Sequence, residues 1–143
     1  MRGVPIPEVT GSFGEIPEVI FPETPGPMGL RVHLFEEGTG AVVQAGDEVV
    51  VNYHGQIWRG PVFDSSYYRE EPARFPIGVG MVIEGWDQAL VGQQVGSRVL
   101  IAVPPAKGYG AAGNPRAGIK GDDVLLFIVD IVDVKKTAFS AQV

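Results

Sequence analysis

The chain has 143 residues, 45% of them hydrophobic and 20% charged, which is an ordinary composition for one globular domain. The formal net charge of −6, without a basic cluster longer than Lys135-Lys136, argues against a nucleic-acid or membrane-surface partner. Because cysteine is absent, disulfides, thiolate catalysis and cysteine-based zinc sites are excluded.

The sequence shows neither a membrane span nor a signal-peptide pattern. No apolar stretch approaches the roughly 18 residues that a membrane-spanning helix requires. The first residues also lack the apolar run of about 7–15 residues found in secretory signals. We therefore expect a cytoplasmic protein without a membrane partner. A signal peptide removed before the first residue stays an open alternative.

Residues 1–29 differ in composition from the rest of the chain, since six of the twelve prolines lie there. Proline pushes the residue before it toward extended backbone. We interpret this segment as an N-terminal arm without a core of its own. Two alternatives stay open, an arm draped over the domain and a disordered tail. The remainder divides into a domain over residues 30–136 and a C-terminal tail over residues 137–143.

The domain begins with the pattern of β-strands. Apolar alternation and β-branched composition predict strands over residues 30–34, 47–58, 73–77, 98–103 and 124–134. On the longest of them, Val51 and Tyr53 share a face that we expect to be buried. His54 and Gln56 share the opposite face.

One stretch, residues 84–91, has helical periodicity. Trp86, Ala89 and Leu90 are spaced to form one apolar face, and Gly92 is suited to end the helix. One short helix among about five strands predicts an α+β fold, in which a curved antiparallel sheet wraps over the helix.

A G-x-G-x-x-G pattern occupies residues 108–113 and follows a predicted strand. The dinucleotide-binding interpretation also requires a helix to begin there. Pro115 and Gly118 oppose such a helix. We therefore expect a surface loop that presents Tyr109, and no cofactor.

His33 and His54 are the two histidines of the chain, and neither belongs to a metal-binding motif. We expect no metal site and expect both side chains to be exposed on their strands. A triad of His54 with Ser65 or Ser66 lacks the G-x-S-x-G elbow of hydrolases, so we do not favour covalent hydrolysis.

The aromatic residues are the remaining candidates for a site: Tyr53, Trp58, Phe63, Tyr67, Tyr68, Phe75, Trp86, Tyr109 and Phe127. Several would fill the core, but Tyr109 in a glycine-rich loop is poorly placed for that. The residues alone therefore indicate an aromatic-lined pocket without nucleophile, metal or cofactor.

Six short motifs then occur in order: Val51-Asn52-Tyr53-His54-Gly55, Phe63-Asp64-Ser65-Ser66, Val82-Ile83-Glu84-Gly85-Trp86, Gly96-Ser97-Arg98, Gly108-Tyr109-Gly110 and Leu126-Phe127. Over roughly residues 30–134 the chain resembles the FKBP-type peptidyl-prolyl cis-trans isomerases, which bind tacrolimus and rapamycin. The arm and residues 75–80 look like those of the single-domain actinobacterial members.

The resemblance implies a cofactor-free enzyme that assists folding by accelerating rotation about X-Pro bonds in an apolar pocket, without a covalent step. The implied catalytic residues are Asp64, Tyr109 and Trp86. The implied substrate-binding residues are Tyr53, Phe63, Arg69, Phe75, Met81, Val82, Ile83, Trp86, Tyr109, Ile119 and Phe127. The implied partners are proline-containing peptides or proteins and macrolides such as tacrolimus and rapamycin. We expect a monomer.

Individual roles follow from the same resemblance. Trp86 would form the pocket floor, while the Tyr109 hydroxyl and the amides near Val82 and Ile83 would donate to substrate carbonyls. Arg69 would hold Asp64 or Tyr53 in place, and Ile119 would lie on a flap over the pocket.

Three positions depart from the family pattern. Ala73 stands where an aromatic residue is common, Met81 where Glu is common and Asn114 where His is common. These changes leave macrolide affinity and substrate preference open. The alternative function is a proline-peptide-binding or chaperone module with incidental turnover. A further hypothesis is that apolar-Pro pairs of the arm, such as Ile16-Pro17, occupy the pocket of the same chain or of a neighbour.

Overall fold

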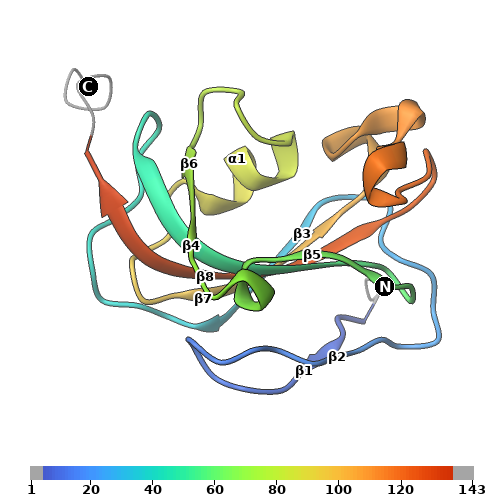
Figure 1. The fold of residues 1–143 in the computed structure, drawn as a ribbon, viewed down its shortest axis with the longest axis horizontal. Coiled ribbons are helices and arrows are strands. Elements are labelled where there is room, and N and C mark those ends of the chain that lie inside the picture. The colour runs from blue at the N-terminus through green and yellow to red at the C-terminus, as the bar shows by residue number, and fades with distance from the viewer. Residues whose placement is uncertain (1–4, 137–143) are drawn as a thin grey trace.

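The computed structural model describes residues 5–136, and a curved antiparallel sheet forms its framework (Figure 1). The strands are β3 (Arg31–Glu36), β4 (Glu48–Ile57), β5 (Val62–Ser65), β6 (Ala73–Pro76), β7 (Arg98–Val103) and β8 (Leu125–Lys135). Five of them follow in the order β3-β7-β8-β4-β5, and β6 also pairs with β4. The predicted α+β fold with about five strands is confirmed, and β5 is the strand that the sequence did not predict.

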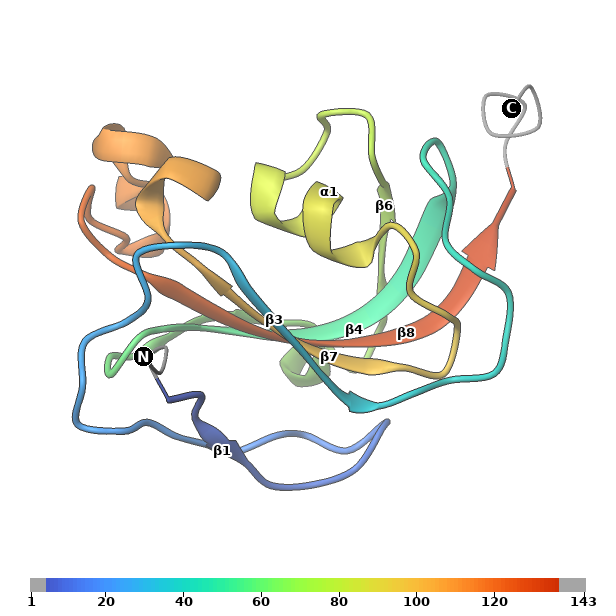
Figure 2. The same cartoon turned by 180° about the vertical axis from the view of Figure 1, so that it is seen from behind.

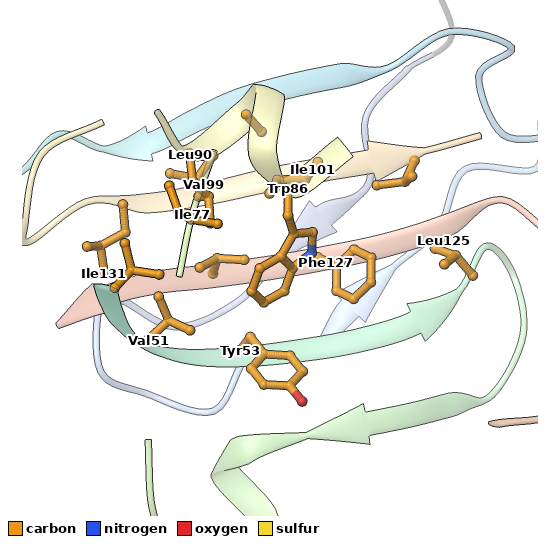
Figure 3. Close-up of a cluster of buried hydrophobic side chains, with 14 of the residues drawn as sticks. Val51, Tyr53, Ile77, Trp86, Leu90, Val99, Ile101, Leu125, Phe127 and Ile131 are labelled. Atoms are coloured by element: carbon orange, nitrogen blue, oxygen red, sulfur yellow. The ribbon is translucent and has the colours of Figure 1, made fainter. Parts of the chain in front are cut away.

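The predicted helix is α1 (Glu84–Leu90), which lies in the concave face of the sheet (Figures 1 and 2). Its buried residues are Gly85, Trp86, Ala89 and Leu90, so the predicted apolar face is the one that packs. On the face of the sheet that packs against α1, the core also contains Val49, Val51, Val99, Ile101, Phe127, Val129 and Ile131 (Figure 3). This side of the molecule holds the pocket described below.

The arm covers the opposite face of the sheet and adds the short hairpin β1 (Glu8–Val9) and β2 (Val19–Ile20) (Figure 2). A second hydrophobic core lies between the arm and the sheet. The sheet contributes Leu100, Ala102, Leu126 and Ile128, and Trp58 follows directly after β4. The arm contributes Ile6, Val9, Val19 and Phe21. Of the two alternatives, the structure therefore confirms for residues 5–29 the arm draped over the domain. All six residues of β7 are buried because its two faces are both covered.

Polar contacts fasten the arm as well. The Gly14 N–H donates to Asp130 Oδ2 at 2.9 Å, and the Phe13 N–H donates to Glu36 Oε2 at 2.7 Å. Trp58 Nε1 donates to the Thr24 carbonyl at 2.9 Å. Since the arm lies on the face away from α1, the hypothesis that residues 5–29 enter their own pocket is wrong.

The prediction for His54 is also wrong, whereas His33 is exposed as expected. The His54 side chain retains 3% of its accessible surface because the arm covers its face of β4. Pro17, Val19 and Ile20 of the arm line a groove there together with His54. The predicted tail, residues 137–143, lies outside the described residues, and the domain boundaries stay a prediction.

Candidate active site

A pocket of about 460 Å³ opens on the concave side, between the start of α1 and the sheet. It is lined by Tyr53, Phe63, Asp64, Phe75, Gly80, Met81, Val82, Ile83, Trp86, Tyr109 and Phe127. Nearly all of the predicted site residues therefore surround one cavity, although they come from separate parts of the chain.

Trp86 forms the floor of the pocket from the first turn of α1 and is 4% exposed (Figure 3). Its indole meets the rings of Tyr53, Phe75 and Phe127 edge-on, with centroids 5.3–5.4 Å apart. The edge of one ring is electropositive and the face of the next electronegative, so such contacts favour a defined arrangement. The floor and the walls formed by these rings are consequently well packed and apolar.

Gly55 on β4 leaves the space that two wall residues occupy. A Cβ atom at this position would lie 2.8 Å from the ring of Phe63 and 3.1 Å from that of Phe127. These two rings meet at 89° with centroids 5.6 Å apart. The glycine thus explains why Phe63 on β5 and Phe127 on β8 both reach the pocket.

The polar part of the pocket is a network of Tyr53, Asp64 and Arg69. The Tyr53 hydroxyl, which points toward β5 in Figure 3, donates to Asp64 Oδ2. Arg69 Nη1 donates to Asp64 Oδ1 at 2.6 Å, and Arg69 Nη2 donates to the Tyr53 hydroxyl at 3.2 Å. Arg69 therefore contacts both predicted partners, although it does not itself line the cavity.

The network fixes the charge state of the site. Burial would raise the pKa of the Asp64 carboxyl, but the hydrogen bonds from Tyr53 and Arg69 together outweigh it and lower that pKa. Burial, followed by the hydrogen bond to Asp64, raises the pKa of Tyr53 to about 12. Asp64 is thus a carboxylate with both oxygens engaged, which suits an orienting group and not a proton acceptor.

Tyr109 stands at the rim, on the loop between two short 3-10 helices, Pro105–Lys107 and Gly110–Ala112. It is 39% exposed. Lys107 Nζ lies 2.5 Å from Glu84 Oε2, which joins this loop to the first residue of α1. The ion pair connects the Tyr109 rim to the wall formed by Val82 and Ile83.

The structure departs from the expectation for Ile119. Its side chain is 4% exposed and belongs to the core beneath the loop, and it is absent from the pocket lining. Reciprocal backbone hydrogen bonds with Asn114, at 2.9 and 3.0 Å, close this loop. Gly80 lines the pocket and was missed by the sequence reasoning. The sequence signal that could have indicated Gly80 was its neighbour Met81, which was predicted to bind substrate.

Within residues 5–136, no group of three or more His, Cys, Asp or Glu side chains is arranged to hold a metal ion. None of the helices in this range has the length and apolar character needed to cross a bilayer. An aromatic pocket with a neighbouring carboxylate, set in a small antiparallel sheet that wraps one helix, has the form of a ligand-binding or active site.

Comparison with known proteins identifies the family. The model of the FKBP-type peptidyl-prolyl cis-trans isomerase family matches residues 40–132. An FK506-binding protein of Streptomyces anulatus is 40% identical over 121 residues, which are 84% of this chain and 98% of the relative. This chain belongs to the FKBP-type peptidyl-prolyl cis-trans isomerases. The matched region falls within the predicted domain of residues 30–136.

Other relatives agree. The peptidyl-prolyl cis-trans isomerase Mip of Coxiella burnetii is 42% identical over 76% of this chain and 46% of its own length. The crystal structure of FkpA from Escherichia coli superposes with a TM-score of 0.68 at 40% identity, covering 75% of this chain and 48% of FkpA. The structure of AtFKBP13 gives 0.68 at 34% identity, covering 78% and 97%. The chain thus spans about half the length of Mip and FkpA.

Proposed function

We propose that the pocket over Trp86 binds the prolyl ring of an X-Pro segment and accelerates rotation about the preceding peptide bond without a covalent step. The observation that carries the proposal is the combination of an apolar, aromatic floor with a carboxylate whose oxygens are already engaged. Proline-containing peptides or proteins are then the substrates.

The chemistry requires no proton transfer. Rotation breaks amide resonance and meets a barrier of about 18–20 kcal/mol, so uncatalysed exchange takes roughly tens to hundreds of seconds. The twisted transition state has less charge separation than the planar amide. An apolar pocket therefore disfavours the planar ground state more than the transition state, which is differential binding.

Hydrogen-bond donors add to this effect. Val82 and Ile83 line the pocket, and their backbone N–H groups have no backbone acceptor among residues 5–136. Together with the Tyr109 hydroxyl they can donate to substrate carbonyls. A thousandfold acceleration needs about 4 kcal/mol, which desolvation and two or three positioned hydrogen bonds can supply.

The direct test is an isomerisation assay on an X-Pro peptide, by exchange NMR or coupled proteolysis. We expect the pure protein to accelerate exchange and Tyr109→Phe to lower kcat/KM by about tenfold, the value of one hydrogen bond made in the transition state. The unfolding midpoint should not change because Tyr109 is at the rim. A wild-type protein that leaves the exchange rate unchanged would contradict the proposal.

Macrolide binding is proposed for the same pocket, supported by relatives named as FK506-binding proteins. Tacrolimus should compete with the X-Pro peptide and abolish the acceleration. Any ability to hold unfolded protein that survives this block would favour the chaperone alternative. Met81, 70% exposed at the rim, and Ala73 on β6 are the positions to vary if affinity is low.

The pH dependence of the reaction is a further prediction. A lowered folded-state pKa keeps Asp64 ionised throughout its ordinary range, and its contribution is lost only as pH falls through the folded value. The Tyr53 hydroxyl keeps its proton until pH rises to about 12. We therefore expect kcat/KM to be flat between about pH 5 and 9. A bell-shaped profile within that range would argue for acid–base catalysis instead.

A further inference from the structure

One wall of the pocket is built by a segment without regular structure. Residues 77–83 connect β6 to α1, and Gly80, Met81, Val82 and Ile83 line the cavity. Packing holds the middle of this segment weakly, since Val79 is 39% exposed and Met81 is 70% exposed. Val82 and Ile83 pack against the core. The segment also contains two glycines with left-handed backbone, Gly78 with φ of +79° and Gly80 with φ of +78°. Glycine loses more backbone conformational freedom on folding than any other residue, so fixing this segment at two glycines has a large entropic cost.

A single side chain ties both glycines down. Asp87, the residue after Trp86 on α1, accepts a hydrogen bond from the Gly78 N–H at Oδ1, 2.7 Å away. Its Oδ2 accepts a second one from the Gly80 N–H at 3.0 Å. Hydrogen bonds to an ionised carboxylate are stronger than those between neutral groups. Asp87 does not line the pocket, so it acts on the wall and not on the ligand.

The helix therefore carries the floor and the anchor of the wall on consecutive residues. Trp86 forms the floor, and Asp87 binds the segment that forms the wall. Val82 and Ile83 follow Gly80 by two and three residues, so the position of their N–H groups depends on the same anchor.

We propose that Asp87 is a positioning residue for isomerisation: its carboxylate bridges Gly78 and Gly80 and thereby holds the Val82 and Ile83 N–H donors over Trp86. This role rests on the proposed function of the pocket. Loss of the carboxylate leaves two backbone donors without a partner and frees the wall, which weakens substrate docking more than the rotation of bound substrate.

Asp87→Asn tests the proposal because asparagine keeps the shape but can accept from one glycine only, its amide group opposing the other. We expect kcat/KM to fall about tenfold, with most of the change in KM, and amide exchange at Gly78 and Gly80 to become faster. Asp87→Glu, which restores both acceptors, should recover part of the loss. A merely structural residue would change the unfolding midpoint without this split between KM and kcat.

The matched control is Glu36→Gln, which weakens a carboxylate bond to one backbone N–H, that of Phe13, on the far side of the sheet. Its kcat/KM should stay within about twofold of the wild type. Unchanged kinetics in Asp87→Asn beside an active wild type would overturn the positioning role alone. Unchanged exchange at the two glycines would also overturn it. An inactive wild type would instead overturn the proposed function and this role with it.

Discussion

Arg98→Met should lower the free energy of unfolding by about 3–5 kcal/mol, because it leaves the buried carboxylate of Asp130 without its cation. Arg98 and Asp130 are 1% and 0% exposed, and Arg98 Nε lies 2.7 Å from Asp130 Oδ1. Burial would lower the pKa of Arg98, but the hydrogen bond and charge of Asp130 outweigh it and raise that pKa. Arg98 therefore keeps its charge, and loss of the pair removes a large part of a typical stability of about 5–15 kcal/mol.

The same side chain also fastens the arm, since Arg98 Nη2 donates to the Glu15 carbonyl at 2.5 Å. Urea unfolding measures the change, with Arg74→Met as the control. Arg74 forms an exposed ion pair with Glu48 at 3.7 Å, so its loss should cost at most about 1 kcal/mol. Equal effects of the two substitutions would show that the buried pair contributes no more to stability than an exposed one.

Trp86→Leu should abolish most of the isomerase activity, with kcat/KM reduced by about 100-fold or more, which corresponds to about 2.7 kcal/mol. The substitution removes the floor and the edge-on contacts with Tyr53, Phe75 and Phe127. Some loss of stability will accompany it because the indole is buried.

Trp58→Leu separates the two effects. Trp58 is the other tryptophan of the chain and is 9% exposed, but it lies in the second core, on the face covered by the arm. Its replacement should destabilise the protein while kcat/KM, measured on the folded fraction, changes little. An equal loss of activity in both variants would mean that Trp86 acts through stability alone.

The sequence predicted the strands and the helix well where one side-chain pattern decides the structure. Alternation on β4 and the spacing of Trp86, Ala89 and Leu90 on α1 report directly which face is buried. The motif resemblance then brought together residues from distant segments, such as Tyr53 and Tyr109, which local patterns cannot relate.

The remaining features depend on packing between distant segments. The polar strand β5 (Val62–Ser65) has no clear alternation, and the two-residue strands of the arm are too short to have any. His54 occupies a polar face by its position on β4 and is buried only because the arm covers that face. The contact of Asp87 with Gly78 and Gly80 likewise depends on how α1 meets the preceding loop.

The central place of β8 has a consequence for how the protein is made. This strand pairs with both β4 and β7. Its Asp130 accepts a hydrogen bond from the Gly14 N–H, which lies 116 residues earlier in the sequence. A chain emerges from the ribosome from its N-terminus. The arm therefore emerges before β8, which is translated last among the described strands and forms part of the surface that the arm covers. Contacts of such long range slow folding. During synthesis the arm therefore lacks Leu126, Ile128 and Asp130 of its binding surface until residues 125–135 have left the exit tunnel. A premature stop before them removes this part of the surface together with Phe127 of the pocket wall.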